Sequence, residues 1–360
     1  MRIFRSFLLM TFVATVFLFF LPLLGKRLLP VSVIFLSPET MAARLLNSQN
    51  ATSSPKPQSE LSPELRRQAN AFETASTIYW RVRFPRTLFA LFAGAGLALA
   101  GMVFQAIFRN PLATPFTLGV SSGASFGATL YYLLPLHFAF FGLGGVTWFA
   151  FGGAMLAVFV VHLLSISRNA SSEEMLLAGV AVSLFFSSLI LLMQYVAEHN
   201  QIFRMIRWIM GGLENSSADH LYFLVPVVLV GMTLLFLHSR ELNILLTGNE
   251  RAMTLGVNVG RVRLVTFYLV SLLVGGIVSV CGPIGFVGLI VPHLCRLVVG
   301  PEHGKLAPAS ALFGGVFLAL CDTIARSLIA PYEIPVGVIT SLLGGPFFLW
   351  LLLRRHSGRL

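Results

Sequence analysis

The chain has 360 residues, and its composition is that of a membrane protein. Hydrophobic residues make up 56% of it and charged residues 11%, whereas soluble domains usually carry about 25% charged residues. A spanning helix needs about 20 apolar residues, so this composition allows roughly ten spans and excludes two soluble domains, a collagen-like chain and a disordered chain. The net charge of +11 would suggest nucleic acid in a soluble protein; here we attribute it to topology and expect no nucleic-acid partner.

Apolar runs between charged or Pro/Gly breaks predict an all-α, polytopic membrane helix bundle. The first run is long and lacks a small-residue cleavage site, which favours a retained anchor over a signal peptide. The eighth is short and contains Pro292, so the count is open by one or two. The ten predicted spans are residues 6–24, 86–107, 115–135, 143–164, 174–196, 220–238, 263–281, 284–299, 307–325 and 335–353.

The distribution of positive charge predicts that both termini are cytoplasmic. With that orientation, thirteen of the 25 Lys and Arg residues lie inside, as the positive-inside rule requires. The chain then divides into a first transmembrane helix (1–24), an outer segment (25–84) and a transmembrane core (85–360). Residues near 47–72 are rich in Ser, Pro, Gln and Asn and bury too little apolar surface to offset the entropy of ordering. We expect a flexible insertion there.

Small residues recur at the spacing that lets helices approach closely. Gly119, Gly123 and Gly127 follow one another every four residues, and Gly94 and Ala98 do the same in the preceding span. Such spacing is typical of helix contacts in lipid, where small side chains allow backbones to touch. The sequence therefore predicts a compact bundle.

One span carries a polar stripe. Ser183, Ser187 and Gln194 fall on one face of the predicted helix 174–196. A polar face in a bilayer points toward a partner helix or toward a watery path, and the sequence leaves these two readings equal.

Ionisable residues within the spans are few. Asp322 and Arg326 stand four apart on the ninth span, a spacing at which they can form an ion pair. An ion-coupled carrier would normally place more ionisable groups at the midplane. This scarcity weakens the alternative function that we keep, a secondary transporter of a small molecule.

No motif for catalysis or for ATP binding is present. The nearest approach to a phosphate-binding loop, residues 300–306, has the wrong Gly spacing and ends in Leu306, which lacks the hydroxyl that binds magnesium. We therefore expect no enzyme and no catalytic residue. Cys281, Cys295 and Cys321 lie in apolar stretches without metal-ligand spacing, so we expect buried thiols and no metal site.

The longest inner connection, residues 240–263, predicts short helical pieces. A helix can start near Asn249 and stop at Gly256, and a second can start near Asn258. Four arginines in this connection suit a cytosolic partner, but they also suit an ordinary inner loop under the positive-inside rule. The sequence alone does not separate the two.

Seven sequence motifs stand out between about residue 75 and the C-terminus. They are RFPRT at 83–87, RNPLATPFTLGVSSGASFG at 109–127, LLAGVAVS at 176–183, WIMGGL at 208–213, LGVNVGRVR at 255–263, GPIGFVGLIVPHLCRLVVG at 282–300 and PVGVITSLLGGPFFLWLLLRR at 335–355. By these motifs the chain resembles the permease subunits of ABC importers for iron-siderophore complexes, haem and cobalamin. Nothing in that family explains residues 47–72.

The resemblance implies a homodimer of ten-helix subunits in lipid, in the bacterial inner membrane. It implies two cytosolic ATPase subunits, which bind ATP and Mg, and a periplasmic substrate-binding protein; this chain itself would carry no cofactor. The cargo would be a metal chelate, and the sequence does not choose between iron-siderophore, haem and cobalamin.

The resemblance also assigns roles to residues at matching positions. Arg83, Arg86 and Arg326 match arginines that receive acidic residues of the binding protein, because a guanidinium pairs with a carboxylate bidentately. Ser171 and Ser172 match the cytoplasmic gate, and Ser183, Ser187 and Gln194 become candidate path lining. Helices near 241–263 match those that couple to the ATPase, through Asn249, Glu250, Arg251, Leu255, Gly256, Val257 and Arg261.

Overall fold

The computed structural model describes residues 15–25, 28–37, 40–41, 63–166, 172–214, 218–329 and 332–357. Within them the chain is a bundle of helices with one two-stranded antiparallel hairpin, β1 (Ala139–Phe140) and β2 (Leu143–Gly144). The helices are η1 (Leu21–Leu23), α2 (Ser32–Phe35), α4 (Pro63–Thr77), η3 (Ile78–Arg83), α5 (Phe84–Ile107), η4 (Pro115–Leu118), α6 (Val120–Leu133), α7 (Gly145–Ile166), α8 (Ser172–Val196), α9 (His199–Ile209), α10 (Ala218–Leu237), α11 (Ser239–Leu245), α12 (Asn249–Thr254), α13 (Val259–Cys281), α14 (Val287–Val299), α15 (His303–Leu328) and α16 (Val336–Ser357).

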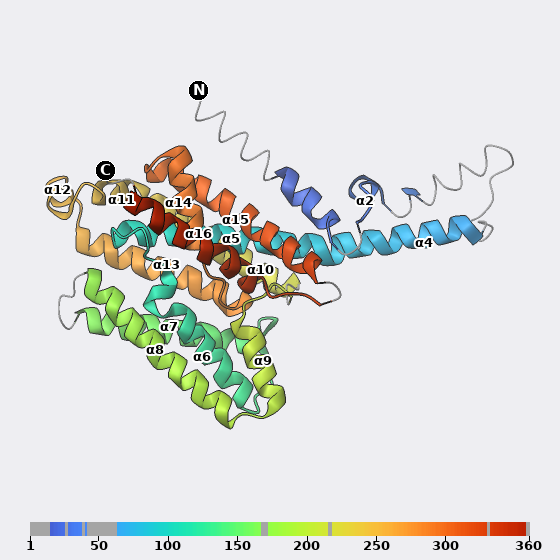
Figure 1. The fold of residues 1–360 in the computed structure, drawn as a ribbon, viewed down its shortest axis with the longest axis horizontal. Helices are drawn as coiled ribbons and strands as arrows, with labels where there is room; N and C mark the ends of the chain where they lie inside the picture. Colours follow the sequence, from blue (N-terminus) through green and yellow to red (C-terminus); the bar gives the residue numbers. More distant parts are fainter. Residues whose placement is uncertain are drawn as a thin grey trace.

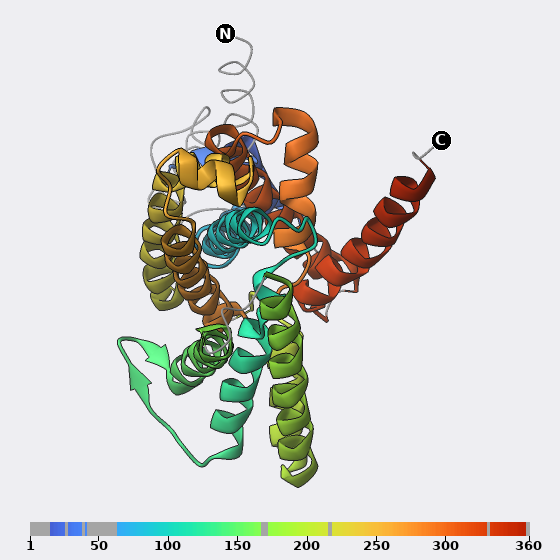
Figure 2. The ribbon, with the colours of Figure 1, turned by 90° about the vertical axis from the view of Figure 1, so that its left-hand side faces the viewer.

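The core of the bundle is built around α5. Every residue from Gly96 to Ile107 is buried, and α15 runs alongside this helix (Figures 1 and 2). A Cβ atom on Gly94 would lie 2.3 Å from the carbonyl oxygen of Gly314 in α15, and one on Gly123 would lie 2.4 Å from that of Gly153 in α7. The predicted close helix contacts are therefore confirmed. Three free cysteines are buried as expected, Cys281, Cys295 and Cys321.

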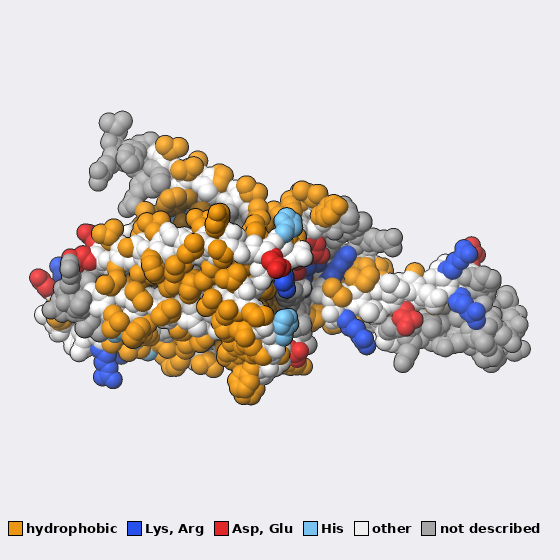
Figure 3. Space-filling view, turned by 90° about the horizontal axis from the view of Figure 1, so that it is seen from below, with side chains coloured by type: hydrophobic (Ala, Val, Ile, Leu, Met, Phe, Trp, Pro, Cys, Tyr) orange, Lys and Arg blue, Asp and Glu red, His pale blue; other side chains and the backbone are white. Residues whose placement is uncertain are grey.

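The helices agree with the predicted spans. Each predicted span from the second to the tenth overlaps one helix from α5, α6, α7, α8, α10, α13, α14, α15 and α16. In the described part of the chain, six helices are long and apolar enough to cross a membrane, and α14 and α16 are shorter apolar helices. Of the predicted first span, residues 6–14 lie outside the described residues, and residues 15–20 are helical. Figure 3 shows hydrophobic side chains over the middle of one face and charged side chains toward its ends, as a membrane band requires.

The outer segment is more ordered than we predicted. Residues 63–72, which we expected to belong to a flexible insertion, are helical in α4, while residues 42–62 lie outside the described part. Pro63 at the first position and Glu64 in the first turn favour a helix start, and Leu, Arg, Gln and Ala then propagate it. One continuous helix therefore runs from α4 through η3 into α5 (Figure 1).

Candidate functional site

The three polar-stripe residues line one cavity. Ser183, Ser187 and Gln194 of α8 border a space of about 910 Å³, together with side chains from α6 and α16. The other residues that line it are Phe116, Ser121, Ser122, Ser125, Ile190, Leu191, Ile209, Met210, Pro283, Gly285, Gly337, Val338, Ser341 and Leu342. None of these lining residues is ionisable, so within the described chain the cavity wall is polar but uncharged.

Three of the six serine hydroxyl groups that line this cavity donate to a carbonyl of their own helix or of its cap. Ser183 Oγ donates to the carbonyl of Gly179 at 2.8 Å, Ser122 Oγ to that of Gly119 at 3.1 Å, and Ser341 Oγ to that of Gly337 at 2.8 Å. A serine that donates to its own helix keeps its oxygen lone pairs as acceptors. The wall therefore offers weak, neutral acceptors and some apolar surface to a ligand.

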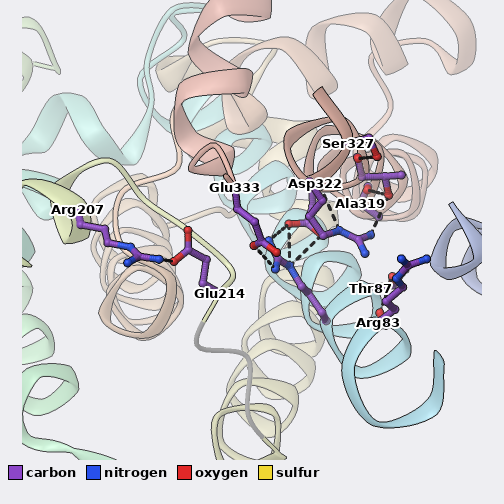
Figure 4. A network of polar contacts seen from close by, with 11 residues as sticks. Arg83, Thr87, Arg207, Glu214, Ala319, Asp322, Ser327 and Glu333 are labelled. Atoms are coloured by element: carbon purple, nitrogen blue, oxygen red, sulfur yellow. Dashed lines mark hydrogen bonds and ion pairs between the residues drawn. The ribbon is translucent and has the colours of Figure 1, made fainter. Parts of the chain in front are cut away.

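A cluster of four charged side chains lies at the end of the bundle opposite α12, which we predict to be the outer end. Asp322 of α15 accepts from Nε of Arg86 at 3.0 Å and from NH2 at 2.8 Å, and Nε of Arg326 lies 3.0 Å from its second oxygen. The predicted Asp322–Arg326 ion pair is thus confirmed. NH1 of Arg86 donates to Oε2 of Glu333 at 2.7 Å (Figure 4). We call Arg86, Asp322, Arg326 and Glu333 the outer charge cluster.

Burial divides the outer charge cluster into a fixed part and an open part. The exposed fractions of the side chains are 1% for Asp322, 9% for Arg86 and 8% for Arg326, but 42% for Glu333. Removing one partner of a buried ion pair costs about 3–5 kcal/mol, because the other charge stays buried and unpaired. A pair with an exposed partner contributes about 0–1 kcal/mol. The bond to Glu333 is therefore the weak one.

Arg83, the third predicted docking residue, is engaged elsewhere. Its NH1 donates to the carbonyls of Pro22, Leu23 and Leu24 at 3.2–3.3 Å, so it caps the last turn of η1. The structure brings Arg86 and Arg326 together through Asp322 and leaves Arg83 beside the end of the first predicted span. Docking of a partner by these three arginines stays a prediction.

The opposite end of the bundle carries the predicted coupling residues (Figure 1). As predicted, a short helix, α12, starts at Asn249, and Gly256 follows its end with a φ of +80°. The start predicted near Asn258 belongs to the spanning helix α13, where the Asn258 side chain accepts from the backbone N–H of Arg261. A cleft of about 560 Å³ opens beside α12, lined by His238, Arg240, Glu241, Ile244, Leu255, Gly256, Val257, Asn258, Arg261, Val262 and Val265.

Asn249 joins α12 to two other elements. Its Oδ1 accepts from NH2 of Arg109, just after α5, at 2.7 Å and from NH2 of Arg263 in α13 at 3.1 Å. Arg109 also donates to the carbonyl of Leu245 at the end of α11, at 2.8 Å. The remaining coupling residues Glu250, Arg251, Leu255, Gly256 and Arg261 are exposed, and Val257 is half-buried.

The predicted gate is the least described part. Ser171 lies outside the described residues, and Ser172 is the first residue of α8. Its role stays a prediction.

Sequence reasoning missed the residues that link elements. Glu333 carried a signal, because an acidic residue between Pro331 and Pro335 interrupts the boundary of two apolar spans. Arg109 and Arg263 counted only as inner positive charges, and no pattern in the sequence indicates that both donate to Asn249.

The chain is similar in sequence and in fold to known transport permeases. A model described as the FecCD transport family matches residues 43–354. The cobalamin import system permease protein BtuC of Halobacterium salinarum is 43% identical over 79% of this chain and 75% of that protein. The hemin transport system permease protein HmuU of Yersinia pestis is 38% identical over 78% of this chain and 85% of that protein. A solved structure described as an inward-facing conformation of a putative metal-chelate type ABC transporter aligns with a TM-score of 0.71 and 32% identity, covering 88% of this chain and 100% of that one.

Proposed function

Because the chain belongs to the FecCD transport family, we propose that it is the non-catalytic permease subunit of an ATP-driven, binding-protein-dependent importer that moves a metal chelate across the inner membrane. ATP and Mg are bound by two separate cytosolic ATPase subunits. The cargo class is that of the related permeases, an iron-siderophore, haem or cobalamin.

The uncharged cavity is the observation that carries this proposal. A wall of serine hydroxyls and apolar groups gives a bulky chelate weak contacts without a deep binding site, as a path requires. Its described lining holds no carboxylate or histidine that could carry a coupled proton. The energy for transport then comes from other chains.

A second copy of the chain completes the path. The cavity opens between α8 and α16, and both helices expose large apolar side chains there, including Leu191 at 66% and Leu342 at 66%. In the proposed homodimer these side chains are covered by the partner subunit or by lipid.

The two ends of the bundle receive the other partners. The cleft beside α12 takes the ATPase, whose closure shifts the dimer as rigid bodies, and the outer face takes the acidic residues of the binding protein.

Reconstitution in proteoliposomes tests the function. The permease with its ATPase subunits and binding protein should import the chelate only when ATP is supplied on the ATPase side. Uptake driven by a proton gradient in vesicles without an ATPase would contradict the proposal and favour a secondary transporter.

A further inference from the structure

Glu333 closes the outer charge cluster toward the solvent. It is the exposed member of the four, and it occupies NH1 of Arg86 at 2.7 Å. The side chain of Arg86 is otherwise buried and already gives Nε and NH2 to Asp322. NH1 is the nitrogen bonded to a partly exposed group, so it is the position at which a carboxylate of another protein would meet this guanidinium.

We propose that Glu333 is a displaceable internal ligand of Arg86, and that a carboxylate of the docked binding protein takes its place. This inference rests on the proposed function and adds a step to it. It reconciles the predicted docking role of Arg86 with its burial, because the docking nitrogen becomes available when Glu333 leaves.

Asp322 and Glu333 differ in a way that makes the exchange selective. Asp322 is 1% exposed and bridges two arginines, so its departure would leave the buried Arg326 without its carboxylate and Arg86 with only the partly exposed Glu333. Glu333 holds a single nitrogen and is partly solvated, so its carboxylate returns to water on release. Replacing one carboxylate by another also leaves the charge of the cluster unchanged.

The position of Glu333 connects docking to the cavity. It lies in the short segment that leads into α16, where the backbone N–H of Ile334 donates to the carbonyl of Ala325 at 3.3 Å and that of Gly337 to Gly211 at 3.1 Å. The first turns of α16 then line the cavity through Gly337, Val338 and Ser341. Release of Glu333 removes one tether of α16 at this point.

The test uses the full transporter in nanodiscs and measures the Kd for its binding protein. In Glu333→Gln the amide competes poorly for the guanidinium, so the Kd should fall about threefold. The control is Glu214→Gln, because Glu214 pairs with Arg207, which is not a member of the outer charge cluster; its Kd should stay at the wild-type value. Glu333→Asp, which keeps the charge on a shorter side chain, should fall between wild type and Glu333→Gln.

A second measurement tests whether α16 moves, through the accessibility of a cysteine placed on it. A cysteine at Ser341 should react faster with a membrane-impermeant thiol reagent from outside when Glu333→Gln is also present and no binding protein is added. If the wild type binds the binding protein and Glu333→Gln shows an unchanged or raised Kd, the proposed exchange of Glu333 is wrong, but the proposed importer function still stands. A wild-type transporter that binds no binding protein would overturn both.

Discussion

Arg109, just beyond the end of α5, donates to the side-chain oxygen of Asn249 at 2.7 Å, and Asn249 is the first residue of α12. The same oxygen accepts from Arg263 of α13. One amide thus fastens the proposed ATPase-contacting helix to two helices of the core. A movement of α12 would therefore be transmitted to the bundle through the hydrogen bonds of Asn249 to Arg109 and Arg263.

Asn249→Ala should uncouple transport from ATP hydrolysis. Hydrogen bonds from charged donors contribute about 1.5–3 kcal/mol, so we expect the amount of chelate imported per ATP to fall about tenfold while hydrolysis continues. Paired uptake and phosphate-release assays in proteoliposomes measure this ratio. Thr247→Ala is the matched control, because Thr247 Oγ1 donates only to the nearby carbonyl of Ile244; an equal loss in both variants would argue against the link.

Gly256→Pro should also uncouple hydrolysis from uptake. Gly256 has a φ of +80°, and proline is restricted to about −65°, so the turn after α12 must change shape. The protein should still insert, because a Cβ at Gly256 would meet nothing within 4 Å. The control is Gly260→Ala, at a helical glycine in the same connection where a Cβ would meet only Oδ1 of Asn258 at 3.7 Å, an ordinary van der Waals contact. Normal transport by Gly256→Pro would contradict the coupling role of α12.

Asp322→Ala should destabilise the permease far more than Glu333→Gln. Asp322 is the buried bridge between Arg86 and Arg326, and its loss should cost about 3–5 kcal/mol. The partly exposed pair of Glu333 should cost at most about 1 kcal/mol. Thermal melting of the solubilised protein compares the two; similar melting temperatures would mean that burial does not divide the cluster as described.

Gly94→Ala should weaken the contact between α5 and α15. The new methyl group would lie 2.3 Å from the carbonyl oxygen of Gly314, and overpacking of this kind costs about 1–3 kcal/mol. Gly152→Ala provides the comparison, since a Cβ there meets nothing within 4 Å and alanine favours the helix. We expect a lower melting temperature for the first variant and an unchanged or higher one for the second.

Ser187→Phe should obstruct the path. Ser187 lines the cavity of about 910 Å³, so a phenyl ring there should reduce chelate uptake several-fold while the Kd for the binding protein stays the same. Ser188 is the adjacent residue of α8 and does not line that cavity. Ser188→Phe should transport normally, and equal inhibition by both variants would remove α8 from the path.

Spans and close helix contacts were accessible from the sequence, because both leave periodic signals. The Gly94 and Gly123 spacings predicted helix approach, and the Asp322–Arg326 pair followed from an interval of four residues. Asn249 and Gly256 indicated where α12 starts and ends, but the N-cap is Gly248 rather than Asn249, whose side chain accepts from Arg109 and Arg263 instead. In each case the signal lies within one helix or one turn.

Contacts between distant segments could not be predicted in this way. Arg86 lies 236 residues before Asp322, and Arg109 lies 140 residues before Asn249. Such pairs depend on how the helices pack, which no local pattern contains. The helical part of residues 47–72 was missed for another reason: its composition resembles that of disordered chains, but α4 gains stability from the helix it continues and from Phe72 and Ala75, which pack in a small apolar cluster with Tyr79.

The unbroken helix that contains α5 connects the outer charge cluster with the end of the bundle that carries α12. Arg86 lies in the first turn of α5 and Arg109 follows the last residue of α5, so the binding protein and the ATPase would act on the same rigid element. Thermodynamic linkage then requires reciprocity: if ATP-bound ATPase subunits change the affinity for the binding protein by some factor, docking must change the affinity for ATP by that factor. In the importer, docking of the binding protein outside and binding of ATP inside would then each change the affinity for the other.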